Sequence, residues 1–78
     1  MEIRFSPHAE LKVFQRKLFR ERIIETVLHP NFSKPGYNGR EQLFKDFGKK
    51  NFMKVVVVRG SRYVTVVTAH WVAKNKKK

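Results

Sequence analysis

Two valine-rich segments near the end of the chain place the strongest constraint on its fold. Residues 52–59 and 62–72 are rich in the β-branched and aromatic side chains that favour strands, and Gly60-Ser61 stands between them. A two-residue connection of this composition predicts a tight β-hairpin. The chain must therefore build at least part of its core on an antiparallel sheet.

A two-residue turn also sets the register of the hairpin. It places Arg59 opposite Arg62 and Val57 opposite Val64, so that one face is nearly all aliphatic and should meet the core. The period of two puts Tyr63 and Trp71 together on one face of the second strand. His70 falls on the aliphatic face, where it would be a core-edge residue without a chemical role.

The first third of the chain predicts a strand followed by two helices. Residues 2–5 alternate between polar and apolar side chains, as a short strand does, and Ser6-Pro7 then forms a helix start signal. Residues 8–18 and 20–29 have helical apolar spacing, and Pro30 ends the second helix. The residues expected to face the core are Leu11, Phe14, Leu18, Ile23, Ile24, Val27 and Leu28.

The middle of the chain is a loop over residues 31–39, with room for a short strand, followed by a strand over residues 40–47. The fold class is therefore α+β: an N-terminal strand and an αα-hairpin packed on an antiparallel β-meander. Residues 1–73 are expected to form one domain, and residues 74–78 a disordered basic tail.

The charge balance indicates an anionic partner. Eighteen Lys and Arg residues face six Asp and Glu residues, which leaves a formal charge of +12 on 78 residues. Such a surplus destabilises the folded chain by self-repulsion unless a polyanion screens it. Nucleic acid is the first candidate and an acidic protein the second. A surface that serves solubility alone is the remaining interpretation.

Composition excludes several other classes. The chain has no cysteine, so it can form neither a disulfide framework nor a thiolate zinc site. It also has no apolar run of the roughly 20 residues that a membrane span requires, and its first residues lead us to expect no secretory signal. We therefore expect a cytoplasmic protein without membrane contact. Three histidines without clustered carboxylates predict no metal site, and no cofactor motif is present.

The first helix carries a candidate catalytic stripe. His8, Lys12 and Arg16 are spaced by four residues and so lie on one side of the helix. His8 stands in the first turn, where the helix dipole disfavours a positive imidazole, so a neutral His8 could act as a base. A solvated helix face without function is the competing interpretation.

The hairpin carries a second set of candidates. A phosphate bound between Arg59 and Arg62 would offset the repulsion of two like charges placed opposite each other. Tyr63 and Trp71 could stack on unpaired bases, and Lys54 could contact the backbone of a bound strand. His29, at a helix end, receives no role.

The first third of the chain resembles the opening of a known small-domain family. The resemblance rests on His8-Ala9, on Arg16 after six intervening residues, and on the segment IIETVLHP over residues 23–30. The family is an uncharacterised H-A-x6-R family of the RelE/ParE-like toxin superfamily, akin to the BrnT toxins. The segment VVVVRGSRYVTVVTAHW, residues 55–71, resembles the closing strands of that family. Lys17 and Phe19 stand where the family commonly has Gly and a Ser or Thr cap.

The resemblance implies a RelE-like fold and the toxin half of a toxin–antitoxin pair. Such toxins mostly cleave RNA, often mRNA on the ribosome, without a metal, and an acidic antitoxin silences them. The expected function is therefore a metal-independent endoribonuclease with His8, Arg16, Arg59 and Arg62 in the active site. Lys12, Lys54, Tyr63 and Trp71 would hold the RNA. The alternative is a non-catalytic nucleic-acid-binding module, and pairing at a strand edge would allow a homodimer.

Overall fold

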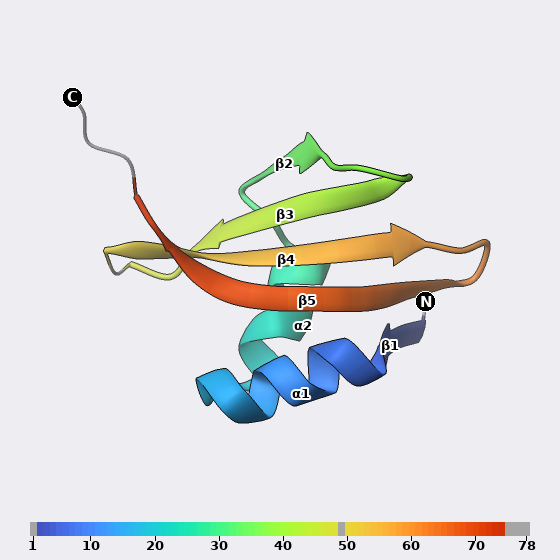
Figure 1. Cartoon of the computed structure of the whole chain (residues 1–78). Coiled ribbons are helices and arrows are strands. Elements are labelled where there is room, and N and C mark those ends of the chain that lie inside the picture. The colour runs from blue at the N-terminus through green and yellow to red at the C-terminus, as the bar shows by residue number, and fades with distance from the viewer. Residues whose placement is uncertain (1, 49, 75–78) are drawn as a thin grey trace.

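The computed structural model describes residues 2–48 and 50–74. Two helices and five strands follow one another along the chain (Figure 1). In order they are β1 (Glu2–Phe5), α1 (Pro7–Arg16), α2 (Arg20–Leu28), β2 (Phe32–Pro35), β3 (Arg40–Asp46), β4 (Asn51–Arg59) and β5 (Tyr63–Ala73). The predicted α+β class is confirmed, and the middle loop does contain a short strand.

The five strands form one sheet in the order β1-β5-β4-β3-β2. Strands β2 to β5 make the predicted antiparallel meander, but β1 pairs in parallel with β5, so the sheet is mixed. Ile3 and Phe5 of β1 lie opposite Val64 and Val66, and both pack against the core. The alternation of polar and apolar residues identifies β1 as a strand. Its pairing with β5 and its parallel direction depend on the contact with Val64 and Val66, which are distant in the chain.

Helix α1 begins as predicted. Ser6 is its N-cap, and the Ser6 hydroxyl accepts a hydrogen bond from the Ala9 amide at 3.0 Å, while Pro7 occupies the first turn. The helix ends at Arg16, two residues earlier than expected, because Lys17 takes a left-handed conformation with φ of 53°. This turn directs Leu18 into the core.

Of the predicted buried stripe of Leu11, Phe14 and Leu18, only Leu18 is buried. Leu11 is 49% exposed and Phe14 is 82% exposed, and α1 packs on β5 through the small residue Ala9 instead. In α2, Ile23 and Val27 are buried as predicted, but Leu28 is 49% exposed. The two helices lie on different strands, α1 along β5 and α2 over β4 and β3, so each buries a narrower stripe than a paired αα-hairpin would.

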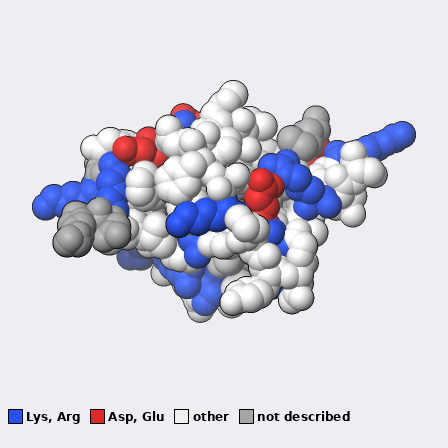
Figure 2. Space-filling model, turned by 90° about the horizontal axis from the view of Figure 1, so that it is seen from above, with Lys and Arg blue, Asp and Glu red and all other residues white. Residues whose placement is uncertain are grey.

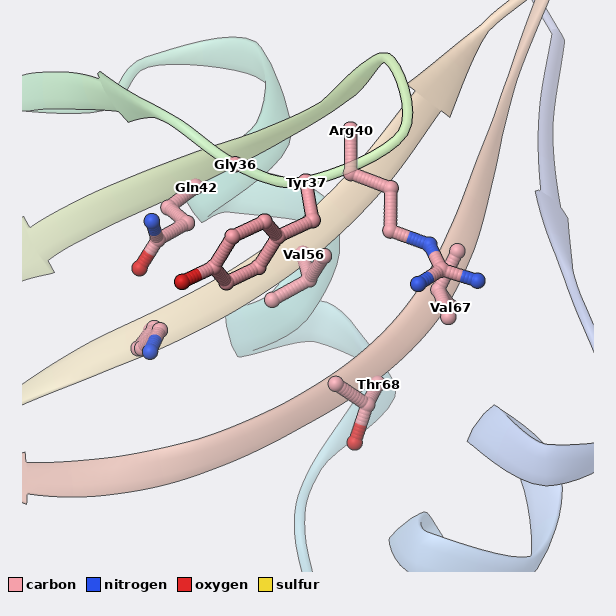
Figure 3. A pocket seen from close by; sticks show the side chains of 8 residues that line it. Gly36, Tyr37, Arg40, Gln42, Val56, Val67 and Thr68 are labelled. Carbon is pink, nitrogen blue, oxygen red and sulfur yellow. The ribbon is translucent and has the colours of Figure 1, made fainter.

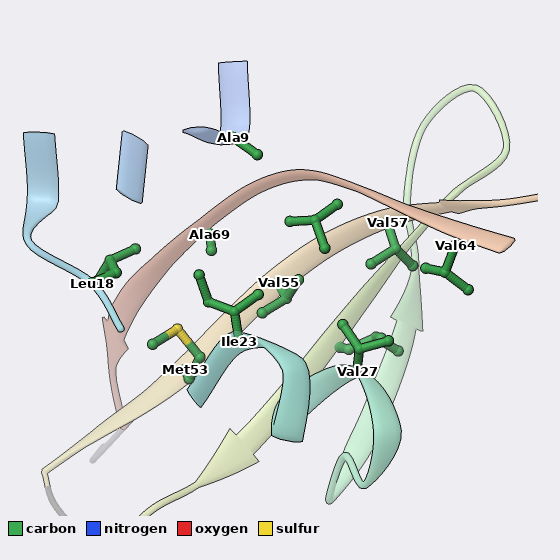
Figure 4. Close-up of a cluster of buried hydrophobic side chains, with 11 residues drawn as sticks. Ala9, Leu18, Ile23, Val27, Met53, Val55, Val57, Val64 and Ala69 are labelled. Carbon is green, nitrogen blue, oxygen red and sulfur yellow. The ribbon is translucent and has the colours of Figure 1, made fainter. Parts of the chain in front are cut away.

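The core lies on one face of the sheet, between the strands and the two helices (Figure 4). Burying one aliphatic side chain of this kind stabilises the fold by about 1.5–3 kcal/mol. The buried cluster comprises Ala9, Leu18, Ile23, Val27, Leu43, Met53, Val55, Val57, Val64, Val66 and Ala69. The aliphatic face predicted for the β4–β5 hairpin is therefore confirmed.

The predicted register of that hairpin is wrong by two residues. Arg59 lies opposite Val64, not Arg62, because the turn is centred on Ser61-Arg62 and not on Gly60-Ser61: the Gly60 amide donates to the Tyr63 carbonyl at 2.8 Å. The Tyr63 ring packs directly on Gly60, where a Cβ atom would approach the ring within 2.6 Å. A larger residue at position 60 would displace the ring, so glycine suits this contact.

A β-bulge changes the faces of β5 beyond this point. Val57 pairs with Val66 but Val56 pairs with Thr68, so Val67 is the extra residue. The expected faces are reversed after the bulge: His70 lies opposite Lys54, away from the core, and Trp71 lies opposite the buried Met53. Tyr63 and Trp71 therefore lie on opposite faces of the sheet.

The folded part extends to the start of the predicted basic tail. The Lys74 ammonium donates to the Asp46 carboxylate at 2.6 Å, and the Lys74 amide donates to the Lys50 carbonyl at 3.0 Å. The rest of that tail, residues 75–78, lies outside the described residues. Neither α1 nor α2 is long and apolar enough to cross a bilayer.

Candidate functional site

Within residues 2–48 and 50–74, one face of the sheet carries no helix. Both helices pack on the other side, as the contacts of α1 and α2 and the arrangement in Figure 1 show. We call the uncovered side the open face, because the alternation of the strands assigns to it the side chains that point away from the core. These are Glu2, Arg4, Phe32, Lys34, Arg40, Gln42, Phe44, Asp46, Phe52, Lys54, Val56, Val58, Tyr63, Thr65, Thr68, His70 and Val72.

Three phenylalanine rings form a cluster on this face. The rings of Phe32 and Phe44 stack with centroids 4.7 Å apart, and Phe52 meets them edge-on at 5.3 and 6.4 Å. The ammonium groups of Lys34 and Lys54 stand over the Phe44 ring at 5.6 and 6.0 Å from its centroid. The cluster thus positions two cations on the surface through cation–π contacts.

Most carboxylates of the described chain are bound to cations, and Glu2 and Asp46 form such pairs on the open face itself. Glu10 pairs with Arg20, and the other pairs are Glu2–Arg4 at 3.2 Å, Glu25–Lys45 at 3.9 Å, Glu41–Arg59 at 2.6 Å and Asp46–Lys74 at 2.6 Å. Over residues 2–48 and 50–74, Lys34, Arg40 and Lys54 contact no carboxylate. Figure 2 shows the result at the surface: Lys and Arg recur along the molecule, and acidic groups are few.

A cavity of about 300 Å³ opens on the same face. It lies between the β2–β3 connection and strands β4 and β5 (Figure 3). Its lining combines apolar walls, two cations and several neutral polar groups, and it contains no carboxylate. The lining residues are Gly36, Tyr37, Arg40, Gln42, Lys54, Val56, Val67 and Thr68.

A tight turn shapes the rim of this cavity. Asn38 and Gly39 both have positive φ, 56° and 75°, as a type I′ turn requires. The Arg40 amide donates to the Tyr37 carbonyl at 3.0 Å and closes the turn. Tyr37 and Arg40 therefore stand at the two ends of one rigid turn, and both side chains reach over the sheet (Figure 3).

His70 is the one histidine on the open face. Partial burial lowers its pKa below the ordinary value of 6.5, and the positive charges of Lys54 and Arg16 lower it further. Its Nδ1 atom is buried and has no hydrogen-bond partner within the described chain. The imidazole is therefore neutral at pH 7 and is flanked by two cations.

The structure brings one residue of the α1 stripe to this place. The Arg16 guanidinium donates to the Ala69 carbonyl at 2.9 Å, next to His70. Lys12 stays on the exposed side of α1, where it donates to the Gln15 side chain at 3.4 Å, and His8 is exposed in the first turn.

The predicted pocket of His8, Arg16, Arg59 and Arg62 is not assembled. Arg59 stands opposite Val64 and binds Glu41, whereas Arg16 reaches Ala69. The strand between these points spans roughly 16 Å, too far for one phosphate to bridge. Arg62 lies in the exposed turn between β4 and β5.

The two predicted stacking residues have different environments. Tyr63 lies on the open face, with the Arg4 guanidinium 4.1 Å from its ring centroid. Trp71 lies on the core side, where it meets Phe47 edge-on at 6.1 Å. Trp71 therefore does not share the open face with Lys54, the predicted residue that the structure does place beside the cavity.

Sequence reasoning missed Tyr37, Arg40, Gln42 and His70. The Asn38-Gly39 pair is a strong hairpin signal and could have identified the turn that carries Tyr37 and Arg40. No local sequence pattern predicts the bulge that moves His70 to the open face. In the described parts of the chain, no three His, Asp or Glu side chains gather in a metal-binding group. Comparison with protein-family models, curated proteins and solved structures found no match to this chain.

Proposed function

We propose that the protein binds single-stranded RNA on the open face of its sheet. The observation that carries the proposal is the group of cations without carboxylate partners, Lys34, Arg40 and Lys54, set among aromatic rings on one face. Cations bind the phosphates of a strand, and aromatic faces stack on its unpaired bases.

The shape of the surface favours a single strand over a duplex. A five-stranded sheet is too broad to enter a groove, whereas unpaired bases can lie flat on it. Tyr37, 87% exposed, offers a ring that packs on no other aromatic side chain in the described chain. The choice of RNA over DNA rests on the family resemblance, so both are included in the test.

Fluorescence anisotropy with labelled single-stranded RNA and DNA oligonucleotides of the same sequence tests the proposal. The double variant Lys34→Ala/Lys54→Ala should bind an RNA oligonucleotide more weakly than the wild type. Lys12→Ala removes a similar charge from the exposed side of α1 and serves as the matched control. Equal weakening by the Lys12 variant would contradict the open face as the binding surface, and no binding by the wild type would contradict the function.

A second candidate function is cleavage of the bound RNA, favoured by the neutral His70 between Lys54 and Arg16. In this reaction the 2′-hydroxyl attacks the neighbouring phosphate. The O2′–P bond forms, the P–O5′ bond breaks, and the products are a 2′,3′-cyclic phosphate and a 5′-hydroxyl. His70 would accept the 2′-hydroxyl proton, Arg16 would stabilise the charge on phosphorus, and Lys54 would protonate the leaving O5′.

This candidate replaces His8 by His70 as the base, and the two histidines can be tested against each other. Purified protein is incubated with RNA in EDTA, and the ends of the products are determined. His70→Asn should lower the cleavage rate by about 10²- to 10⁴-fold, with RNA affinity retained. His8→Asn should leave the rate unchanged. If His8→Asn lowers the rate and His70→Asn does not, His8 is the base. If the wild-type protein does not cleave RNA, the protein is a binding module without this activity.

A ribonuclease of this type fits the toxin half of a toxin–antitoxin pair, which the family resemblance implies. Expression should then arrest growth, and His70→Asn should relieve the arrest. An adjacent gene for a short acidic protein should also relieve it when the two are expressed together. If expression of the wild-type protein leaves growth unaffected, the toxin proposal is contradicted, whereas the RNA-binding proposal still stands.

A further inference from the structure

The cavity beside the β2–β3 turn has the composition of a nucleotide site. We propose that it takes one adenine nucleotide of the bound strand and so gives the protein a base preference. This inference rests on the proposed RNA binding and adds the identity of the base. It uses four features: an exposed ring, an apolar floor, an oriented amide and a pair of cations.

The ring and the floor form a slot for a flat group. Tyr37 is 87% exposed and is carried at the end of the tight turn, above the sheet. Val56 and Val67 line the same cavity from β4 and β5 (Figure 3). A base inserted here would stack on the Tyr37 ring and cover the two valines, which removes apolar surface from water.

The Gln42 amide can identify the base. Its Nε2 atom donates to the Pro35 carbonyl at 2.8 Å, which fixes the orientation of the side chain. One N–H donor and the Oε1 acceptor then remain free. Adenine presents the complementary pair, an amino donor next to a ring-nitrogen acceptor, and the Gln–adenine pair is the usual bidentate match.

The two cations of the lining suit the phosphate. Arg40 and Lys54 stand in the lining without a carboxylate in the described chain, so both are available to bind a negatively charged group. A free adenine nucleotide and an adenine within a strand share this chemistry. The strand has further phosphates that Lys34 can contact, so it should bind more tightly than the free nucleotide.

Titrations with 5′-AMP, GMP, CMP and UMP, followed by NMR, and with nine-residue oligo(A) and oligo(U) test the inference. The wild type should prefer AMP over the other nucleotides and oligo(A) over oligo(U), and oligo(A) should bind more tightly than AMP. A bidentate contact predicts an A-over-U preference of about 5- to 150-fold. Resonances of Tyr37 and Gln42 should shift.

Gln42→Ala should abolish the preference for A and leave affinity for oligo(U) unchanged. Gln42→Met, which keeps the length of the side chain and adds no charge but offers no N–H donor, should have the same effect. Gln15→Ala, on the exposed side of α1, is the matched control and should change neither affinity. Circular dichroism establishes that each variant is folded.

Two failures can be told apart. If oligo(A) and oligo(U) bind equally, or if the Gln42 variants keep the preference, the adenine site is contradicted while RNA binding stands. A preference for GMP would also contradict it, because Arg40 or Lys54 would then contact the base. If neither RNA nor nucleotide binds, the proposed function itself fails. AMP binding as tight as oligo(A) would make a free nucleotide the ligand.

Discussion

A single inserted residue decides the chemistry of His70. Without the bulge at Val67, His70 would follow the alternation of Val64 and Val66 into the core. The bulge moves it to the open face beside Lys54, where it keeps a buried Nδ1 atom without a partner. Burial and two neighbouring cations then hold the imidazole in its neutral form.

This environment predicts a pH dependence of stability. The pKa of His70 is lowered in the folded state, so just below pH 6.5 the unfolded state takes up a proton that the folded state resists. The free energy of unfolding should therefore fall as the pH drops below about 6.5 and should gain nothing from His70 above it. Urea unfolding at pH 7.5 and pH 5.5 measures the difference.

His70→Asn should lose less stability than the wild type between these two pH values. The pKa values of Asp46 and Glu10 are lowered by their bonds to Lys74 and Arg20, so these carboxylates act on stability below pH 4.5, outside the window. An equal loss in both proteins would contradict the burial of a neutral imidazole.

At the scale of the elements, helical spacing identified both helices but only one of the two buried faces. Ile23 and Val27 of α2 lie fully over the sheet, because α2 crosses β4 and β3. Helix α1 lies beside β5 and contacts it through Ala9, so Leu11 and Phe14 point outward. A helix at the side of a sheet buries only a narrow stripe of its surface. In α1 the small residue Ala9 lies in this stripe and faces the sheet.

The two helices should respond differently to truncation. Ile23→Ala leaves a cavity in the core and should lower the free energy of unfolding by about 2–5 kcal/mol. Phe14→Ala removes a ring that is 82% exposed and should change it by less than about 0.5 kcal/mol. Urea unfolding of both variants at one pH compares them. A larger loss for Phe14→Ala would show that its ring is covered in solution.

For the whole molecule, the arrangement of the acids matters more than the net charge. Five of the six carboxylates bind cations, and two of them, Glu2 and Asp46, do so on the open face. Among residues 2–48 and 50–74, nine cations contact no carboxylate, and three of them, Lys34, Arg40 and Lys54, lie together on the open face. Because the chain carries a net charge of +12, its electrostatic field depends on where its few acidic residues lie.

This distribution predicts the salt dependence of RNA binding. The logarithm of the association constant should fall linearly with the logarithm of the salt concentration, with a slope of about −0.7 for each phosphate neutralised on a single strand. Lys34→Ala/Lys54→Ala should make the slope shallower by about 1.4, for two lost contacts. Anisotropy titrations between low and moderate salt measure it, and an unchanged slope would exclude both lysines from phosphate contact.

Local signals determined the elements of this protein and its charge. The Ser6-Pro7 start of α1, the apolar alternation of β1 and the valine-rich strands around Gly60 all lie within a few residues of what they specify, so they can be interpreted in isolation. The α+β class followed from them, because strands and amphipathic helices with these faces must cover one another.

The tertiary structure decided the partners, the registers and therefore the candidate site. The direction of β1 and the bulge at Val67 depend on strand partners that are distant in the chain. The packing of Tyr63 on Gly60 depends on the room that the aromatic ring requires. A shift of one residue in a strand moves every following side chain to the other face. For this reason His70 and the cavity at Gln42 emerge only when the sheet is assembled.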